Sequence, residues 1–116
     1  GFDCSGFAGT FYAYMGVTIP RDADQQFVKG KPVEDPLQPG DLVFFGEISE
    51  EDIPGPDAVG YVRAAQITHV GISLGGQEFI HANGTDWGVS YNSFDPQSKI
   101  YNRWLHENYR GARRFR

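Results

Sequence analysis

The sequence is poor in the residues that form covalent cross-links, membrane spans or nucleic-acid-binding surfaces. Cys4 is the single cysteine among 116 residues, so no disulfide can form within the chain, and no Cys/His cluster indicates structural zinc. No apolar run approaches the roughly 20 residues that a membrane-spanning helix needs. Ten Lys and Arg stand against fifteen Asp and Glu, and this net charge of -5 argues against a nucleic-acid partner. Any chemistry must therefore rest on Cys4, the three histidines and the acidic residues.

The composition is that of a folded domain. Hydrophobic residues make up 40% of the chain and charged residues 22%, which is enough apolar material to bury a core. Two independent cores would leave fewer than about 60 residues each, a size at which domains become marginal, so we expect one domain over residues 1–116. The sequence begins at Gly1 without an initiator Met, and we expect it to be an N-terminally truncated piece of a longer protein.

The apolar pattern predicts an α+β fold that starts with a helix. Apolar residues recur at helical spacing from Cys4 to Met15, and Gly16 follows where a helix would end. Short apolar runs separated by turns come next, in the order of an antiparallel meander. Alternating basic and apolar residues at the C-terminus suit a final edge strand. The expected elements are helices at 4–15 and about 23–28, strands at 42–45, 67–74, 77–82 and 89–91, and aromatic-rich strands from Tyr101 through Trp104 and Tyr109 to Phe115.

Cys4 lies in the first turn of the predicted helix, a position that favours reactivity of a thiol. The helix dipole and the backbone N–H groups there favour a thiolate and can also stabilise a developing oxyanion. A nucleophilic thiol needs a proton acceptor, for which His69 is the candidate. The acceptor in turn needs a third group that fixes its tautomer, and His81 is the candidate for that role.

The register of the hairpin around Gly75-Gly76 decides whether the two histidines meet. A loop with an odd number of residues, such as 74–76, places His69 and His81 opposite each other on the same face of the sheet. A two-residue loop would instead pair His69 with Ala82 and turn His81 to the other face. The triad hypothesis therefore requires an odd loop or a bulge.

Each of these residues also has a plainer interpretation. A lone cysteine in a helix is more often a small buried hydrophobe than a nucleophile, and histidines in a hairpin are often simply packed or solvated. Composition alone therefore favours a structural role. Metal binding by His69 and His81 is weaker still, because no further ligand lies in the hairpin. His106 has no companion motif and is expected at the surface.

Four short motifs follow one another along nearly the whole chain. They are Asp3-Cys4-Ser5-Gly6-Phe7, Gly40-Asp41-Leu42-Val43-Phe44-Phe45, Thr68-His69-Val70-Gly71-Ile72 and Phe79-Ile80-His81-Ala82. Their order and spacing resemble the NlpC/P60 family of cell-wall cysteine peptidases, and the combination is far more specific than any one motif. The resemblance implies a papain-like fold, in which a helix that bears the nucleophile packs on an antiparallel sheet. It also implies Cys4 as the nucleophile, His69 as the base and His81 as the orienting group.

The resemblance further implies a substrate. Family members hydrolyse peptide bonds in bacterial peptidoglycan stems, typically the bond between D-glutamate and the diamino acid that follows, such as diaminopimelate. In relatives that cut stems with a free N-terminus, the residues beside the cysteine hold the substrate amine, which implies this role for Asp3 and Ser5. The segment Pro20-Arg21-Asp22-Ala23 resembles the family's stretch after the first helix, which implies Arg21 and Asp22 as further substrate-binding residues. No metal and no organic cofactor is implied.

The chain departs from the family pattern in two places. Some relatives that are specific for a free amine have a serine where this chain has Ala23, so the predicted substrate pocket lacks one hydroxyl. The acidic segment 46–66 is longer than in many relatives; a solvated loop is the plainer interpretation, and a lip over the cleft is the functional one. In several relatives, SH3-like modules upstream of the domain close one end of the cleft, and the resemblance allows for such modules in the same protein.

Two alternatives to a peptidase remain open. The same scaffold serves an amidase or acyltransferase, because the triad does not select the acyl group. The other is a non-catalytic peptidoglycan-binding module, which would have no need for Cys4, His69 and His81 together. A redox-sensing thiol protein would need a resolving cysteine, which the sequence lacks. The resemblance places the protein in the cell envelope or in the secreted fraction, with peptidoglycan stem peptides or murein fragments as partners, while some relatives act on recycled fragments in the cytoplasm.

Overall fold

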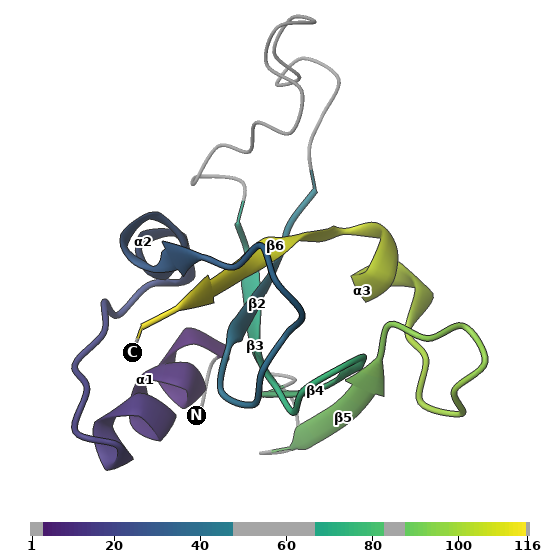
Figure 1. The fold of residues 1–116 in the computed structure, drawn as a ribbon, viewed down its shortest axis with the longest axis horizontal. Coiled ribbons are helices and arrows are strands. Elements are labelled where there is room, and N and C mark those ends of the chain that lie inside the picture. The colour runs from purple at the N-terminus through teal and green to yellow at the C-terminus, as the bar shows by residue number, and fades with distance from the viewer. Residues whose placement is uncertain (1–3, 48–66, 83–87, 116) are drawn as a thin grey trace, which may run out of the picture.

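The computed structural model describes residues 4–47, 67–82 and 88–115 and confirms an α+β fold (Figure 1). Helices pack on an antiparallel sheet of six strands in the order β1-β6-β2-β3-β4-β5. Within these residues, no helix is long and apolar enough to cross a membrane. The elements are α1 (Cys4–Tyr14), α2 (Ala23–Lys29), β1 (Lys31–Pro32), β2 (Leu42–Phe45), β3 (His69–Ser73), β4 (Glu78–Ala82), β5 (Val89–Ser93), α3 (Arg103–Glu107) and β6 (Tyr109–Arg114).

Helix α1 ends close to where the sequence predicts. Gly16 has a φ of 80°, a left-handed conformation that favours glycine and ends the helix. Met15, which the pattern places on the buried face, lies beyond the last helical residue and is exposed. Ala8 and Tyr12 are fully buried, and the Tyr12 hydroxyl donates to the backbone carbonyl of Gly40. One apolar stripe and one buried hydrogen bond therefore hold α1 against the sheet.

Strand β2 lies at the centre of the molecule and divides the core into two parts. All four of its residues are fully buried, because β3 and β6 flank it and both of its faces are covered. The helix-side core lies under α1 and α2 and consists of Ala8, Tyr12, Ala23, Phe27, Leu42, Phe44, Ile67, Val70 and Ile72. The aromatic core lies on the other face and consists of Val43, Phe45, Phe79, Phe94, Leu105 and Ala112.

The C-terminal part of the chain differs from the prediction in two ways. Strand β6 is not an edge strand, because it lies between β1 and β2, and the two-residue β1 that covers it is too short to leave a sequence pattern. Trp104, expected in a strand, lies in helix α3. This helix forms because the Asn102 side chain caps its first turn by accepting a hydrogen bond from the Leu105 N–H at 2.9 Å.

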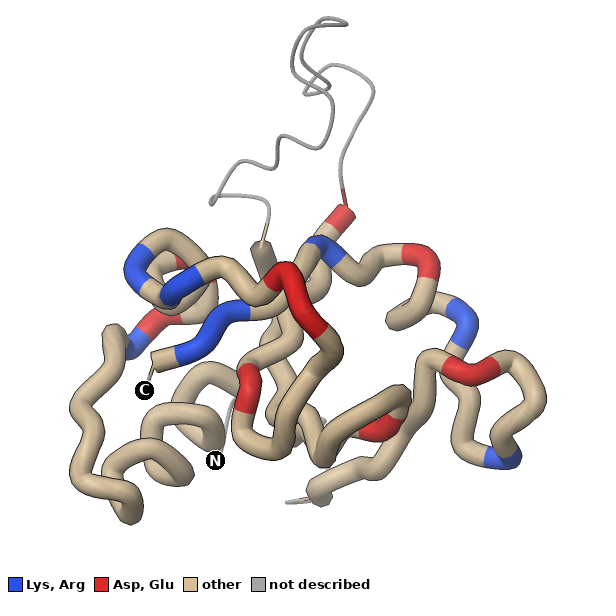
Figure 2. Tube along the Cα trace, in the orientation of Figure 1, with Lys and Arg blue, Asp and Glu red and all other residues tan. Residues whose placement is uncertain are grey.

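The basic side chains of β6 make contacts inside the domain. Figure 2 shows the basic end of β6 beside acidic positions of the segment that joins β1 to β2. Arg114 donates to both carboxylate oxygens of the fully buried Asp41, at 2.7 and 2.8 Å. The guanidinium of Arg113 lies 3.7 Å from the centre of the Phe27 ring. The basic alternation that suggested an edge strand instead ties β6 to the turn before β2 and to α2.

Candidate active site

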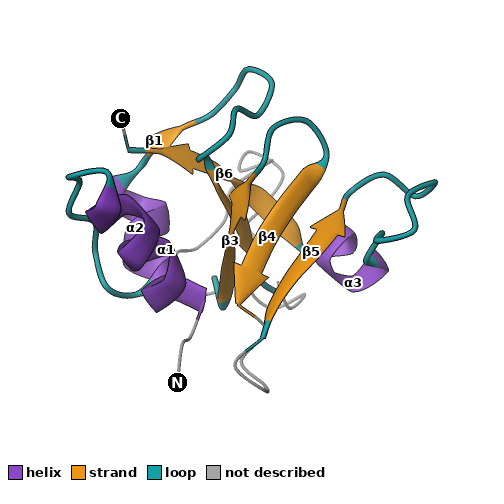
Figure 3. Ribbon diagram, turned by 90° about the horizontal axis from the view of Figure 1, so that it is seen from below, coloured by secondary structure: helices purple, strands orange, loops and turns teal. Residues whose placement is uncertain are grey.

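The three predicted catalytic residues lie on elements that meet at one end of the sheet. Cys4 is the first residue of α1, His69 is the first residue of β3, and His81 is the last but one of β4. Helix α1 packs against both strands. Figure 3 shows the first turn of α1 beside the start of β3 and the end of β4. The topology thus gathers residues that are far apart in the sequence.

Cys4 is partly buried at the N-terminus of its helix. It packs against the helix-side core, which includes Val70, the residue that follows His69. The first turn of α1 contains no acidic residue, so the positive end of the helix dipole faces the thiol without a compensating carboxylate from that turn. This setting lowers the energy of a thiolate relative to a thiol.

A continuous row of hydrogen-bonded polar side chains crosses β3, β4 and β5. His69 Nε2 lies 2.8 Å from His81 Nδ1, and His81 Nε2 lies 2.7 Å from Asn92 Oδ1. The two imidazole rings are nearly perpendicular, at 89°, with centroids 4.9 Å apart. Asn92 Nδ2 donates to the backbone carbonyl of Ile100 at 2.9 Å. The sequence analysis identified the two histidines and missed Asn92.

The signal that would have revealed Asn92 is the register between β4 and β5. Phe79 pairs with Asn92, and His81 pairs with Ser90. Because alternate residues of a strand share a face, Asn92 lies on the same face as His81 and diagonally across from it. The strand predicted at 89–91 was one residue too short to include Asn92, and so brief an apolar run does not fix a register.

The hairpin of β3 and β4 places both histidines on one face, as the odd-loop condition requires, but in a different register. Ile72 pairs with Ile80, and the same register, continued along the strands, puts Gly71 opposite His81. His69 is therefore not directly opposite His81. It reaches the second histidine diagonally across the strand pair.

Gly71 leaves the room that this diagonal contact needs. A Cβ at this position would lie 3.1 Å from the carbonyl oxygen of Ile80 and 3.3 Å from the Cβ of His81, where ordinary contact begins at 3.4 Å. Since glycine has no side chain, the two histidines can approach each other without displacing the backbone of β4.

The charge state of His69 is set by its surroundings. Its pKa is lowered from 6.5 to about 4, first because burial disfavours the imidazolium and second because a positive charge on His81 would repel one on His69. The ring also packs against Phe45, with centroids 5.7 Å apart. At neutral pH, His69 is therefore an uncharged imidazole, which is the form that a general base needs.

A second polar group ties the start of α1 to the segment before α2. Arg21 Nη1 donates to Ser5 Oγ at 3.0 Å, and Gln26 Nε2 donates to the backbone carbonyls of Ser5 at 3.2 Å and Pro20 at 2.8 Å. Ser5 and Gln26 are buried, whereas Arg21 is exposed. Two predicted substrate-binding residues, Ser5 and Arg21, thus meet next to Cys4.

Of the other predicted substrate-binding residues, the structure describes Asp22 but not Asp3. Asp22 is exposed at the N-cap of α2, and its side chain makes no capping hydrogen bond. Ala23, where some relatives have serine, is buried in the helix-side core. Asp3 lies outside the described residues, and so does 48–66, which is most of the expected lip.

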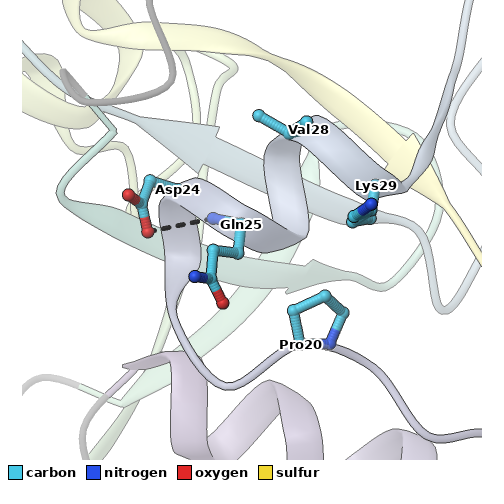
Figure 4. A pocket seen from close by; sticks show the side chains of 5 residues that line it. All are labelled: Pro20, Asp24, Gln25, Val28 and Lys29. Carbon is cyan, nitrogen blue, oxygen red and sulfur yellow. Dashed lines mark hydrogen bonds between the residues drawn. The ribbon is translucent and has the colours of Figure 1, made fainter.

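Two hollows on the surface are lined by none of the predicted catalytic residues. One, of about 340 Å³, includes Tyr109 and the exposed His106, which is at the surface as expected. The candidate site is therefore defined by its row of hydrogen bonds rather than by either hollow. The other hollow, of about 310 Å³, runs along α2 (Figure 4) and is lined by Pro20, Asp24, Gln25, Val28 and Lys29.

Comparison with known proteins adds independent information. The NlpC/P60 family matches residues 1–114. A gamma-D-glutamyl-L-lysine dipeptidyl-peptidase of Bacillus cereus is 33% identical over 116 residues, which is 99% of this chain and 29% of that protein. The chain thus spans less than a third of the length of this relative.

Two solved structures show the same architecture. A crystal structure of an NlpC/P60 family protein from Bacillus cereus matches with a TM-score of 0.71 and 33% identity, over 98% of this chain and 32% of that one. The NlpC/p60 domain of the peptidoglycan hydrolase SagA matches with a TM-score of 0.67 and 26% identity, over 99% of this chain and 78% of that one. The chain belongs to the NlpC/P60 family, and its α+β fold is the fold of that family.

Proposed function

We propose that this domain is a cysteine endopeptidase that hydrolyses peptidoglycan stem peptides at the bond between D-glutamate and the following diamino acid. The observation that carries the proposal is the contact of His69 with His81, which supports a neutral, oriented imidazole on strands against which the helix that begins at Cys4 packs. The names of its relatives, a gamma-D-glutamyl-L-lysine dipeptidyl-peptidase and a peptidoglycan hydrolase, support the choice of substrate. Such a hydrolase would act in the cell envelope or after secretion, where peptidoglycan lies.

In the first half of the reaction, a thioester forms. His69 takes the thiol proton of Cys4, and the sulfur attacks the γ-carbonyl carbon of D-glutamate. The carbonyl oxygen becomes an oxyanion, to which the backbone N–H groups at the start of α1 donate. Collapse of this tetrahedral intermediate breaks the C–N bond, and His69 gives its proton to the leaving amine.

In the second half, water releases the product. His69 takes a proton from water while the water oxygen attacks the thioester carbonyl. Collapse breaks the C–S bond, the γ-carboxyl group of D-glutamate leaves, and His69 returns the proton to the sulfur of Cys4. None of these steps calls on a metal or an organic cofactor.

Charged groups near Cys4 suit the two ends of such a substrate. A D-glutamate that is linked through its γ-carboxyl keeps a free α-carboxylate, and Arg21, held by Ser5, would place a guanidinium beside it. Asp3, next to Cys4 in the sequence, would pair with the free amine of a preceding L-alanine, and Asp22 would add to the same negative side. With a net charge of -5, the domain has little general attraction to anionic wall polymers, so these contacts or SH3-like modules in the same protein would provide capture.

Two stem peptides test the proposal. The purified full-length protein is incubated with L-Ala-γ-D-Glu-meso-diaminopimelate and with its N-acetylmuramyl form, and the products are followed by mass spectrometry. We expect diaminopimelate to be released by the wild type and not by the Cys4→Ala variant. Release from the free-amine peptide alone would also support the pairing of Asp3 with the amine.

Other outcomes would remove parts of the proposal. Release from both peptides would keep the endopeptidase and refute the amine-holding role of Asp3. Release of a different group, with the glutamyl bond intact, would favour the amidase or acyltransferase alternative. No turnover, with a Cys4 that also fails to react with iodoacetamide near neutral pH, would overturn the proposal in favour of a binding module.

A further inference from the structure

The row of hydrogen bonds from His69 to Ile100 contains a residue to which the proposed mechanism gives no role. We infer that Asn92 is a positioning residue that, through His81, holds His69 in the tautomer that can accept the thiol proton. The inference rests on the proposed function and deepens it. Asn92 acts through the two imidazoles rather than by contact with the reacting atoms.

The backbone carbonyl of Ile100 decides which atom donates and which accepts in each hydrogen bond of the row. The carbonyl of Ile100 can only accept a hydrogen bond, so Asn92 turns its Nδ2 toward Ile100 and its Oδ1 toward His81. An amide oxygen also only accepts. The proton in the 2.7 Å contact therefore belongs to His81 Nε2.

The proton on each of the two imidazole rings is assigned in the same way. A neutral imidazole has one N–H and one lone pair, so His81 with its proton on Nε2 accepts at Nδ1. The proton in the 2.8 Å contact then belongs to His69 Nε2, and the lone pair of His69 lies on Nδ1. That nitrogen is the one left to take the proton of Cys4. The lowered pKa of His69 agrees with this assignment, because it keeps the ring neutral.

Without the Asn92 oxygen, the donor and the acceptor in the contact between His69 and His81 could be exchanged. His81 could then carry its proton on Nδ1 and donate to His69 Nε2, which would put the proton of His69 on Nδ1. In that state His69 cannot accept from Cys4. Because His81 is only 7% exposed, water is a poor substitute for the lost acceptor. The substrate would still bind, so the loss would appear in kcat rather than in KM.

Nitrogen-15 spectra of the histidine rings test the inference in the full-length protein. In the wild type, we expect both His69 and His81 to carry the proton on Nε2. The Asn92→Leu variant should show a mixture of tautomers and a kcat lower by about ten- to a hundred-fold, the size seen when the partner that orients a functional histidine is removed. Asn92→Asp keeps an acceptor oxygen and should restore the wild-type tautomers and most of kcat.

Asn108→Ala is the matched control, because it removes another asparagine hydrogen bond, from Asn108 Nδ2 to the carbonyl of Trp104, outside the row. It should leave the ring spectra and kcat unchanged. A wild-type His69 that carries its proton on Nδ1 would overturn the inference, as would an Asn92→Leu variant with wild-type spectra and kcat. If kcat falls equally in Asn92→Leu and Asn92→Asp, Asn92 only holds the segment around Ile100 in place, and the inference is overturned as well.

The ring spectra need no substrate, so they separate this inference from the proposed function. Failure to cleave either stem peptide would count against the endopeptidase, while the tautomers of His69 and His81 would still decide the role of Asn92. If Asn92→Leu does not fold, the wild type and Asn92→Asp together give the answer.

Discussion

Two histidine contacts in this domain have the same length and very different surroundings. His69 Nε2 lies 2.8 Å from His81 Nδ1, and the Tyr101 hydroxyl lies 2.8 Å from His106 Nδ1. The first contact is partly buried beside the start of α1, whereas the second is exposed next to α3. Burial lowers the pKa of His69 to about 4 and keeps its ring neutral. A short hydrogen bond to a histidine is therefore not in itself a sign of a catalytic base.

The two contacts also differ in what fixes their direction. The contact of His69 with His81 continues through Asn92 to a backbone carbonyl, which can only accept. In the other contact, a hydroxyl and an imidazole can each donate or accept, and both are open to water. The two contacts thus differ in burial and in whether a backbone carbonyl determines which atoms donate and which accept.

The largest expected difference between the two contacts is in activity. His69→Ala removes the proposed base and should lower kcat/KM on the free-amine stem peptide by at least about 10³-fold. His106→Ala alters an exposed contact and should change it by less than about twofold. Steady-state kinetics on the two variants and the wild type measure both values. Equal losses of kcat/KM in the two variants would contradict the assignment of the base to His69 rather than His106.

A smaller effect is expected in the dependence of stability on pH. His69 titrates near 4 when folded and near 6.5 when unfolded, so the unfolded chain binds its proton first as the pH falls. The contribution of neutral His69 to the free energy of unfolding is fully present above about pH 6.5. It is lost progressively toward pH 4, by up to about 3 kcal/mol. Urea unfolding of the wild type and of His69→Leu at several pH values tests this. The free energy of unfolding of His69→Leu should fall less than that of the wild type between pH 6.5 and 4. If both fall by the same amount, His69 is not the group responsible.

The smallest expected effect concerns the glycine that lets the buried pair form. Gly71→Ala puts a Cβ 3.1 Å from the carbonyl oxygen of Ile80 and should cost about 1–3 kcal/mol of unfolding free energy, as overpacking usually does. Gly9→Ala is the control, because a Cβ there meets nothing within 4 Å, and it should stabilise α1 by about 0.5–1 kcal/mol. Thermal or urea unfolding measures both. Two changes of the same sign would show that Gly71 is not specially constrained.

Local sequence patterns were sufficient for the elements whose partners follow closely in the chain. Helix α1, strand β2 and the hairpin of β3 and β4 have their apolar positions and turn glycines within a few residues, and the structure confirms them with small shifts of their ends. The hairpin register was not predictable, because the pairing of Ile72 with Ile80 depends on the geometry of the loop.

The C-terminal third depends on contacts that are distant in the sequence. Strand β6 pairs with β1 and β2, which come far earlier in the chain, so its basic residues resembled those of an edge strand. Asn102 did carry a local capping signal for α3, which the aromatic pattern around Trp104 obscured. Asn92 becomes visible as part of the site only when β5 is placed beside β4. Cys4, His69 and His81 could be proposed from the sequence, but not Asn92, which we infer to orient the two histidines.

The backbone carbonyl of Ile100 has one further consequence for the chemistry. To move a proton outward along the row, Asn92 would have to bind it on its amide oxygen, which is a very weak base. The row therefore orients a proton without conducting it. In the proposed reaction, the charge that His69 would gain from the thiol stays on its own ring until the departing amine removes the proton. In that proposal, His69 takes one proton from the thiol and a second from the hydrolytic water, and neither proton leaves through Asn92.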